Sequence, residues 1–147
     1  MSKIGASASR AWRGAALALA ISLLLGCSGD GGLPLSMKIR KIEVYAIAAG
    51  DKITALRTID DAAAIEAIVE ELARLRKTAF EDPEGPANLY EIRFVNGKKS
   101  AVFTLADRYE FVSKIYSRAS ARKGKAWKAT GGLMEKLLGD KRLPRKE

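Results

Sequence analysis

The chain has 147 residues, of which 48% are hydrophobic, and 26 Lys and Arg against 17 Asp and Glu give a formal net charge of +9. This length predicts one domain. Because the sequence has no His and a single Cys, it excludes His-containing catalytic triads, His-based metal sites and an internal disulfide.

The first 26 residues have the layout of a secretory signal. Lys3, Arg10 and Arg13 are the only charged residues before position 30, and an uncharged, mostly apolar run over residues 14–25 follows them. A basic segment followed by a short apolar segment is typical of secretory signals. The run is shorter than the about 20 apolar residues that a transmembrane helix needs. We therefore predict that residues 1–26 form a cleaved signal peptide.

The apolar run ends in Leu24-Leu25-Gly26-Cys27, which resembles the lipobox of bacterial lipoproteins. In that family the Cys thiol receives a diacylglycerol and a peptidase cleaves before the Cys. The resemblance thus implies a fatty-acyl (palmitate-type) membrane anchor on Cys27. A general secretory signal with an incidental Cys and an uncleaved signal anchor are the alternatives.

The residue after the Cys bears on which membrane would hold the protein. Ser28 stands where many lipoproteins of the Gram-negative inner membrane have Asp. The resemblance therefore implies an extracytoplasmic protein on the outer membrane of a Gram-negative host. In a Gram-positive host it implies the outer face of the cell membrane.

Composition divides the rest of the chain into three parts. Residues 27–36 contain the lipidated Cys and a Gly- and Ser-containing stretch with little apolar area to bury, which predicts a flexible tether. Residues 37–139 are predicted to form a single domain. Residues 140–147 are predicted to be a basic tail.

The first half of this domain predicts two strands and a helix. Residues 38–49 alternate with period two, although either face could be the buried one, and residues 52–59 follow a Gly-Asp turn as the second strand of a hairpin. Asp60 and Asp61 are candidate N-terminal caps. Apolar residues at helical spacing predict a helix of about four turns after them, with an inward face of Ile65, Ile68, Val69, Leu72 and Leu75.

The second half predicts more strands and a last helix. A loop at residues 80–87 precedes a hairpin of residues 89–95 and 101–105, joined at Asn96-Gly97. Residues 109–116 fit either a short strand or a distorted helix. The stretch from Arg118 to Lys125 is expected to be an exposed turn, and residues 125–129 a strand with a buried Trp127. Thr130 would cap a short helix over residues 131–138 that ends at Gly139, with Leu133, Met134, Leu137 and Leu138 facing inward.

This order of elements predicts an α+β fold. We expect a small antiparallel sheet of about five strands, with one long and one short helix packed on it. As a whole, the chain resembles small, poorly characterised bacterial lipoproteins with one α+β domain after a cleaved N-terminus. The strands at residues 41–45 and 90–94 are further points of resemblance. The resemblance implies no catalytic residues.

The sequence offers little that predicts catalysis. The loop carboxylates Glu81, Asp82 and Glu84 lack the spacing of a calcium site, so we predict no metal site and no cofactor. No Ser lies in a Gly-x-Ser-x-Gly motif, and the adjacent Ser113 and Lys114 are the candidate Ser–Lys pair. We predict that the protein is not an enzyme. The alternative is a small envelope enzyme that uses carboxylates or Ser and Lys.

The positive charge is concentrated near the C-terminus. Residues 30–107 contain 11 basic and 13 acidic side chains, whereas residues 108–147 contain 12 basic and 4 acidic ones. The alternatives are a solvated surface and a contact with a polyanion. Nucleic acid is not expected outside the cytoplasm, so the candidate partners are anionic lipid headgroups and anionic wall polymers. The candidate contact residues are Arg118, Arg122, Lys123, Lys125, Lys128, Lys141, Arg142, Arg145 and Lys146.

Together these features predict a membrane-anchored lipoprotein. We expect a non-catalytic binding or accessory module of the cell envelope, with an envelope protein or an anionic polymer or lipid as its partner.

Overall fold

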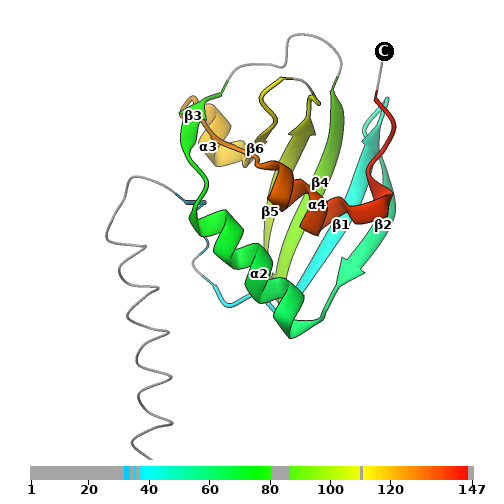
Figure 1. The fold of residues 1–147 in the computed structure, drawn as a ribbon, viewed down its shortest axis with the longest axis vertical. Helices are drawn as coiled ribbons and strands as arrows, with labels where there is room; N and C mark the ends of the chain where they lie inside the picture. Colours follow the sequence, from blue (N-terminus) through cyan, green and yellow to red (C-terminus); the bar gives the residue numbers. More distant parts are fainter. Residues whose placement is uncertain (1–31, 34, 36, 81–86, 110, 146–147) are drawn as a thin grey trace, which may run out of the picture.

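The computed structural model describes residues 32–33, 35, 37–80, 87–109 and 111–145 (Figure 1). Several sequence-based predictions lie outside these residues: the signal peptide, the lipidated Cys27, the loop carboxylates Glu81, Asp82 and Glu84, and the basic residue Lys146.

In the described residues, a single sheet of seven strands forms the centre of the domain, in the order β2-β1-β4-β5-β6-β7-β3. Every neighbouring pair is antiparallel. Both predicted hairpins are present, as β1–β2 and β4–β5. The strands are β1 (Lys41–Ala48), β2 (Lys52–Ile59), β3 (Lys77–Ala79), β4 (Asn88–Asn96), β5 (Lys99–Asp107), β6 (Lys114–Tyr116) and β7 (Lys125–Lys128).

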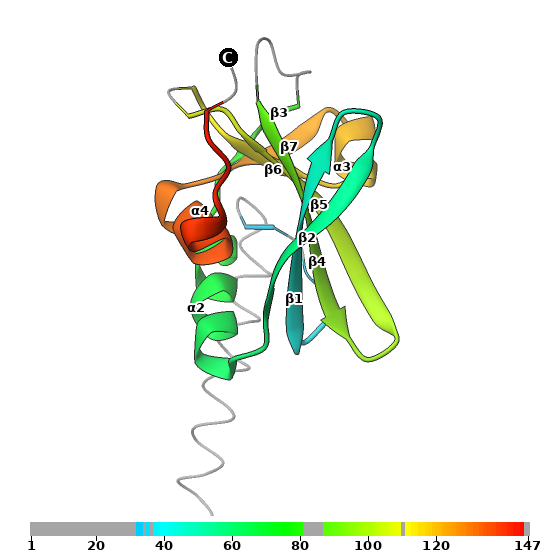
Figure 2. The same cartoon turned by 90° about the vertical axis from the view of Figure 1, so that its right-hand side faces the viewer.

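Two helices cover one face of this sheet. Figure 2 shows α2 (Ala62–Ala73) and α4 (Gly131–Leu138) on the same side of the strands. Lys136 of α4 donates to a carboxylate oxygen of Glu71 at 3.2 Å and so ties the two helices together. A third helix, α3 (Arg118–Arg122), packs on β7, and a 3-10 helix, η1 (Gly139–Lys141), follows α4.

The chain passes from one edge of the sheet to the other between β2 and β3, through helix α2. β2 and β3 are consecutive strands in the chain, yet they form opposite edges of the sheet. Helix α2 therefore carries the chain across the whole sheet (Figure 1). As a result, residues 77–79 lie beside residues 125–127, about fifty positions further along the chain.

The predicted α+β class is confirmed, but the sheet has seven strands instead of about five. The two additional strands contain three residues each, too few to produce a periodic pattern. Residues 109–116 end in the short strand β6, one of the two predicted alternatives. The predicted helices are present. The stretch from Arg118 to Lys125 is largely exposed, as predicted, but its first five residues form the helix α3 instead of a turn.

Local capping interactions explain where the helices begin and end. The Asp61 carboxylate accepts a hydrogen bond from the Ala64 N–H at 2.9 Å, as predicted for the start of α2. The Thr130 hydroxyl caps α4 in the same way through the Leu133 N–H. Gly139, with a φ of +54°, ends α4. These bonds satisfy backbone groups that a helix terminus leaves without a partner.

The core lies between the helices and the sheet. The buried face of β1 carries Ile42 and Val44, so the structure resolves the ambiguity in the sequence pattern. All four predicted inward residues of α4 are buried, whereas Val69 of α2 is 38% exposed, so its predicted inward position was wrong. The large fully buried side chains are Tyr90, Phe94, Ile42, Ile68, Leu72, Leu75, Ile92, Leu105, Ile115, Leu133, Leu137 and Leu138.

The ordered domain begins before Met37. Leu33 is only 6% exposed and belongs to the core. The Gly32 N–H donates to the Leu75 carbonyl at 2.7 Å, and the Leu33 N–H donates to the Leu72 carbonyl at 3.0 Å. Residues 32–33 therefore bind to the C-terminal end of α2, although the sequence predicted that the flexible tether extends to residue 36.

Candidate functional site

The first group of predicted contact residues lies on and beside α3. Helix α3 begins at a capping box, in which the hydroxyls of Ser117 and Ser120 each accept the other residue's backbone N–H at 3.0 Å. Gly124, with a φ of +72°, then turns the chain into β7. All five predicted side chains of this segment are exposed: Arg118, Arg122, Lys123, Lys125 and Lys128.

Trp127 anchors β7, the strand that carries Lys125 and Lys128, in the core. As predicted, it is buried, at 3% exposure. It lies opposite Ile115 of β6 and Lys77 of β3. The Phe80 N–H, just after β3, donates to the Gly124 carbonyl at 2.9 Å. The basic side chains of β7 therefore extend from a strand whose backbone is paired with β6 on one side and with β3 on the other.

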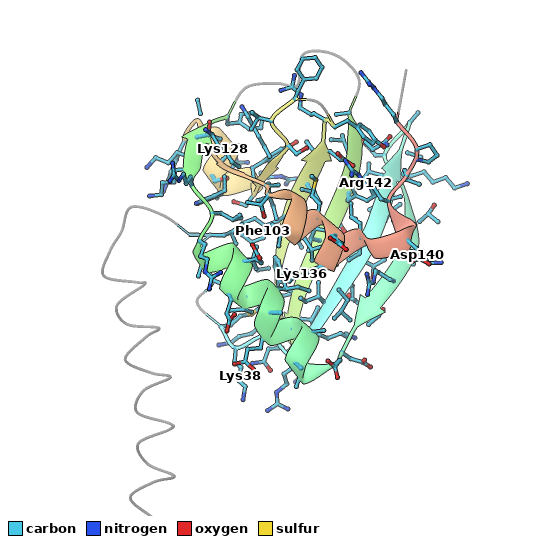
Figure 3. All side chains as sticks on the ribbon, viewed as in Figure 1. Lys38, Phe103, Lys128, Lys136, Asp140 and Arg142 are labelled. Atoms are coloured by element: carbon cyan, nitrogen blue, oxygen red, sulfur yellow. The ribbon has the colours of Figure 1, made fainter. Side chains whose placement is uncertain are left out.

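The second predicted group, at residues 141–145, lies elsewhere. Figures 1 and 2 both place the C-terminal residues and α3 on different sides of the domain. Figure 3 shows the same separation for the labelled side chains of Lys128 and Arg142. The structure therefore does not bring together the two basic groups that the sequence suggested as one polyanion contact.

Arg142 makes an ion pair instead of extending from a free tail. Its Nε donates to Asp107 Oδ2 at 2.6 Å and its Nη2 donates to Asp107 Oδ1 at 2.8 Å. The Asp107 side chain has no exposed surface, whereas that of Arg142 is 39% exposed. The Arg142 guanidinium also lies 4.6 Å from the centre of the Tyr109 ring. Sequence reasoning missed this pair because nothing in the local pattern links positions 107 and 142.

Further hydrogen bonds hold residues 143 and 144 against the sheet. The Asn88 side-chain amide donates to the Tyr109 hydroxyl at 2.8 Å and to the Pro144 carbonyl at 2.7 Å. The Tyr90 hydroxyl accepts the Leu143 N–H at 2.7 Å, and the Tyr109 hydroxyl donates to the Leu143 carbonyl. Two side chains of β4 and one that follows β5 thus bind the main chain of the C-terminal segment.

The environment of this cluster shifts three pKa values. The hydrogen bond to Asp107 raises the pKa of Arg142, which keeps the guanidinium charged. Burial raises the pKa of Tyr90 above its usual value of 10.0. Burial, and then the charge of Asp107, raise the pKa of Tyr109. Both tyrosines are therefore held in the neutral form, which can donate and accept hydrogen bonds.

These shifts predict a loss of stability in alkali. Because the folded protein holds the phenolic protons of Tyr90 and Tyr109 more tightly than the unfolded chain, the contribution of these two tyrosines to the free energy of unfolding should be constant below about pH 9. It should fall as the pH rises through about 10, by up to about 1.4 kcal/mol per pH unit and tyrosine. Urea unfolding at a series of pH values measures this fall. Phenolate absorbance that develops fully in the folded protein at its usual pH, with no loss of stability, would contradict the prediction.

The candidate catalytic side chains make structural contacts with backbone groups. The Ser113 hydroxyl accepts the Arg108 N–H at 2.9 Å, and Lys114 donates to the Ala79 carbonyl at 2.9 Å. Asp61 caps α2. In the part of the chain that the structure describes, no group of three or more His, Cys, Asp or Glu side chains is arranged to hold a metal ion.

The cations near α3 belong to a larger basic surface than the sequence suggested. Residues 74–80 and 111–130 contain nine Lys and Arg and no Asp or Glu. The pairing of β3 with β7 places the first of these segments beside the second. No sequence signal predicts this pairing, because β3 is a three-residue strand. We call this surface the basic edge: Arg74, Arg76, Lys77, Lys114, Arg118, Arg122, Lys123, Lys125 and Lys128.

Comparisons of the chain with protein-family models, with curated proteins and with solved structures gave no match. None of the helices in the described residues is both long enough and apolar enough to cross a membrane.

Proposed function

We propose that this protein is a lipid-anchored lipoprotein of the cell envelope that acts as a non-catalytic binding or accessory module. The observation that carries the proposal is the position of the only Cys, directly after an apolar run and a Gly, in Leu24-Leu25-Gly26-Cys27. Two or more acyl chains on Cys27 would hold the domain stably on a membrane, because one chain alone binds only marginally.

The arrangement of the domain supports a binding role. It presents a basic edge whose residues other than Lys114 are exposed, whereas the Ser113 and Asp61 side chains accept hydrogen bonds from nearby backbone N–H groups. Such a surface suits an anionic partner. The membrane would be the outer membrane of a Gram-negative host or the outer face of a Gram-positive cell membrane.

Replacement of Cys27 by Ala tests the anchor. In cells given a labelled fatty acid, the wild-type protein should carry the label and sediment with membranes. Cys27→Ala should lose the label completely and leave the membrane fraction, because the chain contains no second thiol to acylate.

Ser28→Ala is the matched control, since it changes the next residue and keeps the thiol. It should stay labelled and membrane-bound. An unlabelled wild-type protein, or a Cys27→Ala protein that stays in the membrane fraction, would refute the anchor. Cross-linking in the same membranes tests the accessory role: wild-type protein should recover an envelope partner that Cys27→Ala does not recover.

A further inference from the structure

The structure limits how far the domain can stand from an anchored Cys27. Four residues separate Cys27 from Gly32 in the sequence. At the full reach of an extended chain, the five steps between these two residues span at most about 18 Å. A tether that continued to Met37 would span about 36 Å. The early start of the ordered domain therefore halves the available distance.

Gly32 is held firmly where it joins the domain. Its φ is +78°, and a Cβ at this position would lie 2.8 Å from the Ala73 carbonyl oxygen, so only Gly permits the close approach to α2. Leu33 is buried beside it. The covalent path to Cys27 thus leaves the domain from a fixed point at the C-terminal end of α2.

This fixed point lies next to the basic edge. Gly32 is bonded to Leu75, and the next residue, Arg76, accepts the Lys128 N–H through its carbonyl at 2.9 Å. Figure 1 shows the short segment at residues 32–33, β3 and α3 on the same side of the domain, away from the C-terminal residues. The point at which the chain leaves the domain toward Cys27 therefore lies beside the basic edge.

We infer that the basic edge is the surface by which the domain lies on anionic lipid headgroups of the membrane that holds Cys27. This inference rests on the proposed lipid anchor. With a tether of at most about 18 Å, the edge stays within reach of the bilayer surface. Attraction between Lys or Arg and anionic headgroups is strong only within about a Debye length of that surface. Because the tether is short, the other faces of the domain point away from the membrane.

Lysine footprinting of the full lipidated protein tests this orientation. The protein is placed on vesicles of phosphatidylcholine, with or without phosphatidylglycerol, and acetylation of each Lys is followed by mass spectrometry. On the anionic vesicles, Lys123, Lys125 and Lys128 should react at least about fivefold more slowly than on the neutral ones. Three exposed lysines outside the basic edge should change little and serve as internal references: Lys38, which Figure 3 places far from Lys128, and Lys98 and Lys99 at the turn between β4 and β5. The protection should disappear in 1 M salt, where the Debye length is about 3 Å.

Two charge-matched variants test the proposed orientation independently of the lipid anchor. Arg122→Gln, Lys123→Gln and Lys125→Gln together remove three exposed charges from the basic edge, and Lys38→Gln, Lys98→Gln and Lys99→Gln together remove three elsewhere. Both variants should float with the vesicles through Cys27. Only the first should lose the protection of Lys128.

The outcomes distinguish the two proposals. A protein that floats but reacts equally on both kinds of vesicle, or that is protected at Lys98 and Lys99 instead, overturns the orientation and leaves the anchor standing. Protection that requires an anionic wall polymer in place of anionic lipid also overturns the orientation. A wild-type protein that does not float overturns the anchor and the orientation together.

Discussion

Replacement of Arg142 by Ala is expected to destabilise the domain by about 3 kcal/mol, because it leaves the Asp107 carboxylate buried without its cation. The Asp107 side chain has no exposed surface and accepts two hydrogen bonds from Arg142, at 2.6 and 2.8 Å. Removal of one partner of a buried pair typically costs about 3 to 5 kcal/mol. We expect the lower end of this range because Arg142 itself is 39% exposed. Urea unfolding of the wild-type and variant proteins measures the difference.

An equally short ion pair on the exposed side of the sheet provides the control. Arg93 and Glu91 also lie 2.6 Å apart, but their side chains are 37% and 17% exposed. Arg93→Ala should therefore cost under about 1 kcal/mol. Simultaneous replacement of Asp107 and Arg142 by Leu should cost less than Arg142→Ala, since no unpaired charge remains. Equal losses for Arg142→Ala and Arg93→Ala would show that burial of Asp107 is not decisive.

Hydrogen exchange gives a local measure of the same contact. The Leu143 N–H donates to the Tyr90 hydroxyl in the segment that Arg142 holds in place. In Arg142→Ala this amide should exchange with solvent faster, even under conditions in which the sheet stays folded. Unchanged exchange would indicate that the contacts of Asn88 and Tyr109 hold the segment without the ion pair.

The second large effect is expected at Leu33. Leu33→Ala should cost about 2 to 3 kcal/mol, because the side chain is 6% exposed within the core and its truncation leaves a cavity. Leu35→Ala is the matched control, since Leu35 is only partly buried at the edge of the core. It should cost under about 1 kcal/mol. Urea unfolding of the two variants compares these losses.

This second prediction bears on the length of the tether. If Leu33 anchors the chain to α2, its loss should also speed exchange of the Leu33 N–H, which donates to the Leu72 carbonyl. The path from Cys27 to the first fixed residue would then lengthen, and the protection of the basic edge on anionic vesicles should weaken. If Leu33→Ala and Leu35→Ala cost the same, the ordered domain begins later than Gly32.

The buried C-terminal cluster shows why sequence reasoning assigned Arg142 to the wrong surroundings. A run of basic residues after Gly139 is typical of a solvated tail. In the structure, however, Asp107, Asn88 and two tyrosines bind residues 142–144 and hold them against the sheet. These partners lie between 34 and 56 positions away in the chain. Local charge patterns contain no information about contacts at such separations.

By itself, the sequence determined the elements whose signals are local. The alternation over residues 89–95 and the turn at Asn96-Gly97 predicted the central hairpin. The caps Asp61 and Thr130 marked the starts of the long helix α2 and the short helix α4. It also provides the basis for the proposed anchor at Cys27, because that motif is contiguous in the chain. Only the tertiary structure decided which face of β1 is buried, that β3 pairs with β7, and that Gly32 and Leu33 bind α2. The physical reason is that burial and pairing depend on partners distant in the chain, and a three-residue strand or a two-residue docking segment is too short to display a period of its own.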